Sequence, residues 1–528
     1  MSATQPFTDA INSGYTFKSE SFKIGVGMLG GQAVPDAGVY IPFKTLNRHG
    51  LIAGATGTGK TKTLQVLAES LSDASIPVVL MDIKGDLSGI AAAGVENEKI
   101  TERSAQLGIP FKAAGYPVEL LTLSQQKGVR LRATVSEFGP VLLSKILGLN
   151  DTQAGLVAMI FKYCDDNQMP LLDLRDFIKI LQYISNEGKK EMESLYGSIS
   201  TSSTGTILRK VIELQQQGGD IFFGEKSFEV DDLMRISDDG RGTISILRVT
   251  DLQDRPKLFS TFMLQMLAEL YATSPEIGDA DKPKLVLFID EAHLIFQEAS
   301  SALLQQIETV IKLIRSKGIG IYFCTQNPMD VPASILSQLG LKVQHALRAF
   351  TAADRKVIKE AAQNYPETVF YKTDELLTQL GTGEAFITAL NEKGIPTPLV
   401  HTLLRAPNSR MDVLTETEID NLISKSRLVN KYNQEIDSRS AYEILNEKLQ
   451  AAAEESSTAA RQEQEKKEQA ELQKQQQREE KAKAKEPGFF DSPIVKQAGR
   501  TAASIITRSL LGALGLGGRS SRSRKSIF

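Results

Sequence analysis

The chain has 528 residues, with 61 Lys or Arg against 64 Asp or Glu, which leaves a formal net charge of -3 at pH 7. This length exceeds one ordinary domain, so we expect one large domain with attachments. The balanced charge argues against nucleic-acid binding through the overall charge, and any such contact needs a local basic surface. The two cysteines, Cys164 and Cys324, lack the CxxC spacing of a zinc site and argue against a disulfide framework.

No segment of the sequence resembles a membrane-spanning helix, which needs roughly 18 uninterrupted apolar residues. The N-terminal stretch MSATQPFTDAINSGYTFKSE lacks the basic segment followed by an apolar one that marks a secretory signal. We therefore expect a cytoplasmic protein.

The first half of the chain predicts the beginning of an α/β core. Residues 1–47 form an N-terminal β-rich segment, in which short strands over residues 22–47 are interrupted by Gly and Pro. Residues 48–135 then contain a strand, a glycine-rich loop, a helix and a second buried strand within IPVVLMDIKGDLSG.

Helical periodicity replaces this pattern from residue 136, and we expect a helical insertion over residues 136–240. Strands alternate with helices again over residues 241–405, as in GTISILRV, the helix around LFSTFMLQMLAELYA, KLVLFIDEAH and IGIYFCTQNP. Such alternation is typical of βαβ units, so the sequence predicts an α/β fold with a mostly parallel sheet.

The character of the chain changes after residue 405. Residues 406–486 predict a helical extension rich in Gln, Glu and Lys, and the lack of sustained apolar a and d positions favours a solvated spacer over a coiled coil. Residues 487–528 form a basic amphipathic tail, with seven Lys or Arg and no acidic residue from Ser492 onward.

The octet GATGTGKT, Gly54–Thr61, fits the phosphate-loop pattern G-x-x-x-x-G-K-[ST] between a strand and a helix. Its glycines let the backbone wrap closely around phosphates, so that N–H groups and the helix N-terminus face the negative charge. Lys60 is expected to reach the β and γ phosphates of ATP and Thr61 to bind Mg²⁺. The candidate nucleotide-binding residues are Gly54, Ala55, Thr56, Gly57, Thr58, Gly59, Lys60, Thr61 and Lys62.

The segment KLVLFIDEAH supplies the second half of the candidate site. Five consecutive apolar residues predict a buried strand that delivers Asp290 and Glu291 to the sheet edge where the phosphate loop lies. We expect Asp290 to hold Mg²⁺ and Glu291 to act as the general base toward the attacking water. The alternative is that these two acids only cap the end of the strand at the protein surface. An acid next to the metal-binding Asp indicates an ATPase that converts hydrolysis into motion.

Two further positions are candidates for catalysis. The apolar strand in IGIYFCTQNP ends in Thr325–Gln326 at the same sheet edge. Gln326 can hydrogen-bond both the attacking water and the γ phosphate, unless it is only a polar strand terminus. Arg315 ends the helix after Glu291 and is a candidate arginine finger for a neighbouring subunit, although an exposed arginine at a helix C-terminus is the alternative. Arg348 is a weaker candidate for the same role.

The DIKGD segment follows the second buried strand at the same edge. Its Asp82, Lys84 and Asp86 are candidates to line the nucleotide site or a DNA path, and an ordinary surface loop is the alternative.

Together these motifs resemble the HerA/FtsK-type ATPases of the additional-strand P-loop class, and within it the HerA-like helicase C-terminal-domain group, the YjgR-like proteins. RHGLIAGATGTGKT, VVLMDIKGDLSG, LVLFIDEAH and RSKGIGIYFCTQNPMDVPASILSQLGLKVQHALR follow the order and spacing of that group over most of residues 22–405. About fifty residues precede the glycine loop, fewer than the complete β-barrel of many HerA proteins requires.

The resemblance implies a RecA-like core, a hexameric ring with ATP between subunits, and translocation on duplex DNA through a central channel. By motif it assigns phosphate and Mg²⁺ binding to Lys60 and Thr61, the metal and catalytic acids to Asp290 and Glu291, the sensor to Gln326 and the trans arginine to Arg315.

We therefore expect an ATP-hydrolysing ring motor, a DNA translocase or helicase that uses Mg-ATP at subunit interfaces. The alternative is an assembly or regulatory ATPase docked on an anionic membrane or a protein partner through the basic tail, which can equally hold DNA phosphates. The DEAH letters at 290–293 also resemble superfamily-two helicases, but no second-core arginine motif accompanies them.

Overall fold

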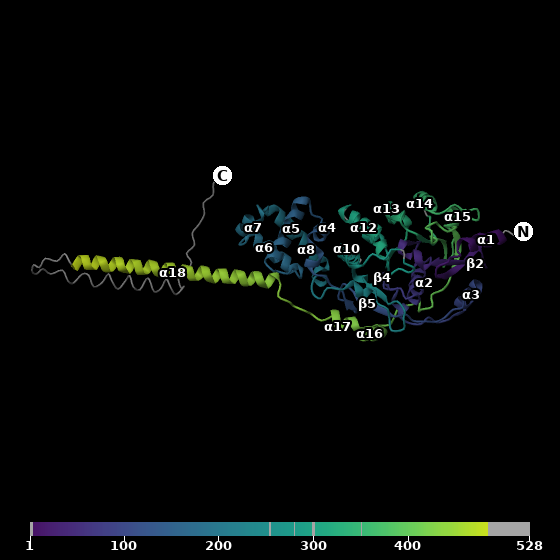
Figure 1. Cartoon of the computed structure of the whole chain (residues 1–528), viewed down its shortest axis with the longest axis horizontal. Helices are drawn as coiled ribbons and strands as arrows, with labels where there is room; N and C mark the ends of the chain where they lie inside the picture. The colour runs from purple at the N-terminus through teal and green to yellow at the C-terminus, as the bar shows by residue number, and fades with distance from the viewer. Residues whose placement is uncertain (1–3, 253–254, 279, 298–300, 350, 484–528) are drawn as a thin grey trace, which may run out of the picture. The chain divides into compact units, whose positions relative to one another are not determined.

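The computed structural model describes residues 4–252, 255–278, 280–297, 301–349 and 351–483 (Figure 1). The chain divides into two compact units, Met1–Lys448 and Leu449–Phe528. The basic tail expected over residues 487–528 lies outside the described residues.

A single sheet of 12 strands organises the described part of the first unit, in the order β2-β1-β12-β11-β10-β3-β9-β8-β4-β7-β5-β6. The strands are β1 Ser21–Leu29, β2 Gln32–Pro42, β3 Gly50–Ala53, β4 Val78–Asp82, β5 Val118–Thr122, β6 Val129–Arg130, β7 Ile244–Arg248, β8 Leu285–Ile289, β9 Ile319–Thr325, β10 Leu341–Gln344, β11 Glu384–Thr388 and β12 Val400–Leu404.

Neighbouring strands from β10 through β3, β9, β8, β4, β7 and β5 to β6 run parallel. Strands β11, β12, β1 and β2 continue the sheet antiparallel, and β1 and β2 are joined by Gly30 and Gly31 with φ of 60° and 81°, which favour a tight hairpin. Strands β3, β4, β8 and β9 are buried at every residue, as parallel strands covered by helices on both faces should be. The expected α/β fold with a mostly parallel sheet is confirmed.

Helices precede, connect and follow these strands. They are α1 Thr4–Gly14, α2 Lys60–Asp73, α3 Glu98–Leu107, α4 Val135–Ile146, α5 Asp151–Asp166, α6 Leu174–Ser185, α7 Lys189–Tyr196, α8 Thr201–Leu214, α9 Asp220–Phe222, α10 Pro256–Thr273, α11 His293–Gln297, α12 Ser301–Ile314, α13 Ala333–Leu336, α14 Ala352–Ala362, α15 Thr373–Leu376, α16 Glu416–Lys425, α17 Arg427–Tyr432 and α18 Ala441–Lys483.

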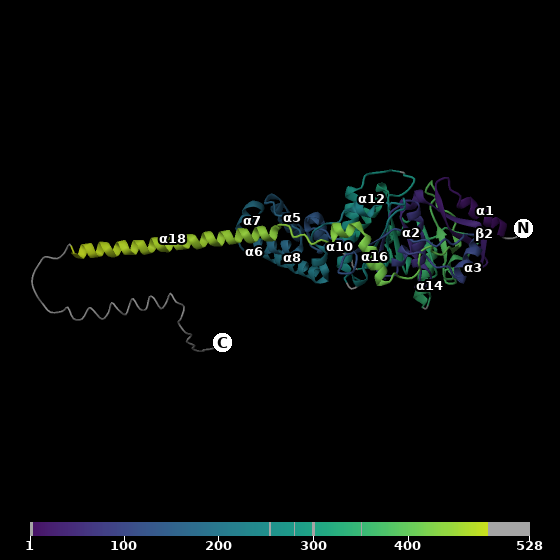
Figure 2. The ribbon, with the colours of Figure 1, turned by 90° about the horizontal axis from the view of Figure 1, so that it is seen from below.

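Helices α4 to α8 lie between β6 and β7 in the sequence and gather into one group in both ribbon views (Figure 1, Figure 2). Three of them begin with a capping box, at Thr134, Asn150 and Asp173, where the side chain of the N-cap accepts a backbone N–H and the third helical residue bonds back. Because each cap satisfies otherwise unpaired N–H groups, the starts of these helices are fixed by local sequence.

Residues 405–411, here called the strap, lie along helix α2, with Arg405 near Ser70 and Met411 at Lys62. The carboxylate of Glu69 on α2 is fully buried and accepts hydrogen bonds from the backbone N–H of Asn408 at 2.9 Å and of Ser409 at 2.9 Å. It also accepts the Ser409 hydroxyl at 2.6 Å and pairs with Arg405 at 3.3 Å. The buried Glu69 carboxylate therefore anchors the strap to α2, together with the Gln65 side chain, which donates to the Ser409 hydroxyl at 2.7 Å and to Arg410 O at 2.9 Å.

Helix α18 begins against the helical insertion. The Asp176 carboxylate on α6 accepts hydrogen bonds from the Ser440 hydroxyl at 2.5 Å and from the Tyr442 backbone N–H at 2.9 Å, and Lys448 pairs with Glu191 at 2.9 Å. The helix is exposed at every residue from 450 to 481, as its lack of an apolar stripe leads one to expect. Among the described residues, no helix has the length and apolar character needed to cross a membrane.

Candidate active site

Three neighbouring parallel strands bring the sequence motifs to one edge of the sheet. Strand β9 lies between β3 and β8, with Ala53 opposite Thr325 and Ile289 opposite Phe323. The phosphate loop follows β3, Gln326 follows β9, and Asp290 follows β8. Since parallel strands end at the same edge, the two halves of the candidate site meet there as the sequence predicted.

The phosphate loop is held by backbone hydrogen bonds to three different strand ends. Gly54 donates its N–H to Thr325 O at 3.2 Å, Ala55 donates to Ala346 O at 2.8 Å, and Gly383 donates to Thr58 O at 3.0 Å. The backbone angle φ is 151° at Gly54, 78° at Gly57 and 115° at Gly59, and residues other than glycine rarely adopt such values. The loop shape therefore depends on these glycines and on anchors far away in the sequence.

The Lys60 ammonium is buried inside the loop that precedes it. Its Nζ donates to Gly54 O at 2.5 Å and to Ala55 O at 3.2 Å. Burial lowers the pKa of Lys60, and the positive charge of Lys84 lowers it further. Thr61, in the first turn of α2, is half-buried, so its hydroxyl lies at the helix N-terminus beside the loop.

A buried histidine behind the loop, His345, was missed by the sequence analysis. Its Nδ1 lies 2.9 Å from Glu384 O and its Nε2 lies 2.9 Å from the Thr63 hydroxyl on α2. A carbonyl can only accept, so Nδ1 carries the proton and Nε2 accepts from Thr63. Burial lowers the pKa of His345 to about 4, so the ring is neutral at pH 7. This contact ties the first turn of α2 to strand β11.

The paired acids have different surroundings. Burial raises the pKa of Asp290 to about 6. Glu291 has a φ of 46°, an uncommon value for a residue with a side chain, and its own side chain is 7% exposed. Burial pushes the pKa of Glu291 upward, but the hydrogen bond and charge of Lys84 outweigh burial and hold the pKa below its usual value.

The DIKGD segment contributes directly to this cluster. Lys84 Nζ lies 2.5 Å from Glu291 Oε1, and His293 Nδ1 lies 3.2 Å from Glu291 Oε2. The Asp82 carboxylate accepts the backbone N–H groups of Gly85 and Asp86 at 2.6 and 3.1 Å, which fixes the turn that carries Lys84. The sequence placed this segment at the edge but did not identify Glu291 as its contact.

The remaining candidates lie in separate places. Gln326 is exposed immediately after β9, at the edge that carries the phosphate loop. Arg348 is exposed and follows β10 at this edge, two residues beyond the Ala346 carbonyl that binds the loop. Arg315 is exposed just before β9 begins, and its carbonyl accepts from Asn47 at 3.4 Å, just before β3 begins. It therefore lies at the opposite edge, and this chain does not bring it together with Lys60.

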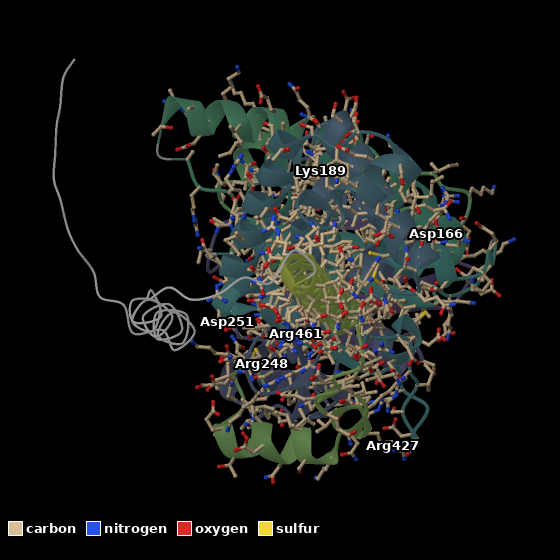
Figure 3. The ribbon with its side chains drawn as sticks, turned by 90° about the vertical axis from the view of Figure 1, so that its left-hand side faces the viewer. Asp166, Lys189, Arg248, Asp251, Arg427 and Arg461 are labelled. Atoms are coloured by element: carbon tan, nitrogen blue, oxygen red, sulfur yellow. The ribbon has the colours of Figure 1, made fainter. Side chains whose placement is uncertain are left out.

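The edge continues beyond β4 with polar side chains after β7 and β5. Arg248 donates from Nη1 to Lys127 O at 2.9 Å, and Asp251 accepts from Gln126 Nε2 at 2.8 Å. Both Arg248 and Asp251 are labelled in Figure 3, with Asp166 and Lys189 on the helical insertion. The loops after β5 and β7 are therefore tied to each other.

A cavity of about 290 Å³ adjoins the phosphate loop. Gly59 and Thr63 line one wall, and Arg103, Gly383 and Leu404 line the other. Arg103 on α3 donates from Nη1 to the carbonyls of Gly383 at 3.2 Å and Leu404 at 3.1 Å, which holds that wall together.

A phosphate loop joined to paired acids across a parallel sheet defines the P-loop ATPases, and the chain is an enzyme of this ATPase and helicase type. The family described as Helicase HerA-like C-terminal matches residues 28–522. The chain belongs to this family.

Similar proteins include the DNA double-strand break repair helicase HerA of Sulfurisphaera tokodaii, which is 23% identical over 374 residues, covering 70% of this chain and 68% of that protein. A probable helicase of Methanocaldococcus jannaschii is 23% identical over 65% of this chain and 63% of its own length. The DNA import protein CedB of Sulfolobus acidocaldarius is 24% identical over 68% of this chain and 52% of its own length. The chain thus spans between about half and about two thirds of the length of these relatives.

Two solved structures are similar in fold. The plasmid coupling protein TrwB, solved in complex with ADP and Mg²⁺, has a TM-score of 0.49 and 14% identity over 75% of this chain and 97% of its own. VirB4 of Thermoanaerobacter pseudethanolicus has a TM-score of 0.46 and 15% identity over 74% of this chain and 98% of its own.

Proposed function

We propose that this protein is a ring-forming motor that hydrolyses Mg-ATP at its subunit interfaces and translocates along DNA or separates its strands. The observation that carries the proposal is the meeting of Lys60 with Asp290 and Glu291 at one sheet edge, where the charges of the two acids act on the Lys60 ammonium. Such an edge binds a phosphate chain on one side and places acids toward its terminal phosphate on the other.

Each residue of the site then has a distinct task. The loop N–H groups and Lys60 hold the phosphates, and Glu291 takes a proton from the attacking water. Gln326, exposed immediately after the strand between them, orients that water. Lys62, whose ammonium donates to Met411 O at 2.5 Å, links the loop to the strap.

Asp290 and Thr61 fit a magnesium ion. The Asp290 carboxylate is buried and its pKa is raised to about 6, so a divalent cation would stabilise its ionised form. Among the described residues no cluster of three His, Cys, Asp or Glu could form a complete protein cage. This suits Mg²⁺, which commonly uses one or two protein ligands together with substrate phosphates. Bound there, the ion would neutralise charge on the phosphates during hydrolysis.

The cavity beside Gly59 and Thr63 offers a place for the nucleotide base. It adjoins the loop that holds the phosphates and has apolar walls at Leu404 and Met411, which suit a flat ring. Arg103 closes it toward α3 through its backbone contacts.

DNA as the polymer is supported by the relatives, which include a DNA double-strand break repair helicase and a DNA import protein. Assembly into a hexameric ring is part of the same proposal and follows from the resemblance of the motifs to the HerA/FtsK-type ATPases. In a ring, Arg315 of one chain would reach the phosphates bound by its neighbour, since it lies at the edge opposite Lys60.

The test measures ATP hydrolysis by the full chain against protein concentration, alone and with duplex or single-stranded DNA at fixed salt. We expect hydrolysis per chain to rise with concentration and with DNA. Subunits carrying Arg315→Ala, mixed with unchanged ones, should lower the rate by more than their share, whereas Lys312→Ala, an exposed residue one turn earlier, should not. Full hydrolysis by isolated monomers would refute the ring.

A further inference from the structure

Lys84 is a charged group at the sheet edge that contacts the candidate base and has no task in the proposed mechanism. It lies in the turn after β4, the neighbour of β8 in the sheet. The Asp82 carboxylate holds this turn through Gly85, Asp86 and Leu87 N–H groups at 2.6, 3.1 and 3.2 Å. Gly85 has a φ of 76°, which favours glycine. Lys84 therefore extends from a fixed backbone, and only its side chain is free to move.

The side chain of Lys84 spans from solvent to the buried acids. It is 36% exposed, whereas its partner Glu291 is 7% exposed, and their charged atoms lie 2.5 Å apart. Burial tends to lower the pKa of Lys84, but the hydrogen bond to Glu291 and the charges of Asp290 and Asp86 raise it overall. Lys84 is therefore a cation held at the entrance of the site by several carboxylates.

The charge of Lys84 also acts on the phosphate-loop lysine. Burial lowers the pKa of Lys60 most, the positive charge of Lys84 lowers it further, and the charges of Glu291 and Asp290 raise it. Lys84 therefore contacts Glu291 and acts electrostatically on Lys60, so it belongs to the same charged cluster. Of these two lysines, Lys60 belongs to the known loop pattern, and Lys84 comes from a segment outside it.

The contact with Lys84 places a cation at one oxygen of the candidate base. Lys84 Nζ lies 2.5 Å from Glu291 Oε1, and His293 Nδ1 lies 3.2 Å from Oε2. Each carboxylate oxygen can accept more than one hydrogen bond, so the ammonium competes with a water molecule for Oε1 and does not exclude it. Lys84 is the more exposed of the two partners, and its departure would leave Oε1 to the water.

We propose that Lys84 is a second phosphate-contacting lysine, which exchanges Glu291 for the terminal phosphate of a bound nucleoside triphosphate and so releases Glu291 toward the water. The inference rests on the proposed function. A terminal phosphate beside Lys60 carries more negative charge than one carboxylate and forms charge-assisted hydrogen bonds with an ammonium. A diphosphate lacks that group, so the exchange distinguishes the two nucleotides.

The experiment measures equilibrium binding of two fluorescent nucleotides with Mg²⁺ to the full chain, ADP and a non-hydrolysable ATP analogue. We expect Lys84→Ala to lower the affinity for the ATP analogue by about tenfold, which is the equivalent of one charged hydrogen bond. The affinity for ADP should change by less than about twofold. Lys84→Arg should retain most of the preference, and Lys112→Ala, an exposed lysine outside the site, should retain all of it.

Two results would overturn the inference. If Lys84→Ala lowers the affinity for both nucleotides equally, Lys84 only supports the structure of the site. If it lowers neither affinity, Lys84 only pairs with Glu291. Thermal unfolding of Lys84→Ala shows whether the compared chains are folded, because loss of the ammonium leaves the Glu291 carboxylate, which is 7% exposed, without this partner. Lys84→Gln, which keeps a hydrogen-bond donor but no charge, should show the same selective loss of the ATP analogue if Lys84→Ala is destabilised.

The same experiment separates this inference from the proposed function. Lys60→Ala should weaken both nucleotides, since its ammonium lies within the loop itself. If the unchanged protein binds neither nucleotide, or Lys60→Ala binds both normally, the ATPase proposal fails whatever Lys84 does. If Lys60 matters and Lys84 shows no preference for the triphosphate, only the role of Lys84 fails.

Discussion

Replacement of Glu69 by glutamine tests how the strap is held on α2. The side chain of Glu69 is fully buried and accepts two backbone N–H groups and one hydroxyl from residues 408 and 409, and it also pairs with Arg405. Glu69→Gln keeps the shape of the side chain but replaces one acceptor oxygen with an NH₂ group. This group then faces donors of the strap and of Arg405. The substitution also leaves the Arg405 guanidinium, whose side chain is 12% exposed, without its counter-charge.

The magnitude follows from these contacts. Removal of one partner from a buried ion pair costs about 3–5 kcal/mol, and the amide oxygen that remains keeps the loss near the lower end, about 3 kcal/mol. For an m-value of roughly 3 kcal/mol per molar urea, the midpoint of unfolding should fall by about 1 M.

The chain has no Trp and 12 Tyr, so tyrosine fluorescence is the natural signal for unfolding in urea. Glu102→Gln is the matched control, because Glu102 is exposed on α3 and its charge is lost without burial. Equal midpoints for the two variants would refute the view that a buried carboxylate holds the strap.

Three further predictions concern the site and its pH dependence. Glu291→Gln should lower ATP hydrolysis by about 10²–10⁴-fold with nucleotide affinity retained, measured by phosphate release and by binding; a normal rate would exclude Glu291 as the base. His49 and His345 are buried with pKa values lowered to about 4. Because the unfolded chain takes up their protons at a pKa of about 6.5, the stability they confer is full above that pH and is lost as the pH falls toward 4, by about 2 kcal/mol per histidine at pH 5. Urea unfolding at pH 7.5 and 5 measures this, and replacement of either histidine by Asn should remove its share; an unchanged pH dependence in both variants would contradict the assignment. Gly57→Ala and Gly59→Ala should both weaken nucleotide binding, because both glycines have a positive φ that alanine rarely adopts. Gly59→Ala should weaken binding more, since of the two added Cβ atoms only the one at residue 59 meets a neighbour within 4 Å. Equal nucleotide affinities of the two variants would show that this contact relaxes.

The parts of the site that consist of consecutive residues could be predicted from the sequence. The glycine pattern ending in Lys60 and the apolar run before Asp290 each carry their own signal, because local spacing fixes both the loop and the strand. Alternation of strands and helices then implied a parallel sheet, and parallel strands end at one edge. The loop and the acids are therefore expected at one edge from the sequence alone.

The contacts between distant segments were not predictable in this way. His345 follows a short strand and has no motif of its own, and its partners Thr63 and Glu384 are far from it in the sequence. The Lys84–Glu291 pair likewise depends on which strands become neighbours in the sheet, and β4 lies beside β8 only because of the strand order. Side-chain pairing across strands follows from topology, and periodicity alone does not give the order of strands.

The position of Arg315 has a consequence for the symmetry of any assembly. Arg315 precedes β9, whereas the phosphate loop follows β3, so the arginine and the loop lie at opposite ends of two neighbouring parallel strands. A two-fold axis could pair the arginine of each copy with the loop of the other only by bringing opposite ends of the strands together twice, and the pair would then be closed to further copies. A head-to-tail contact repeated by rotation needs one such meeting per interface, and it gives every copy the same polarity around the axis.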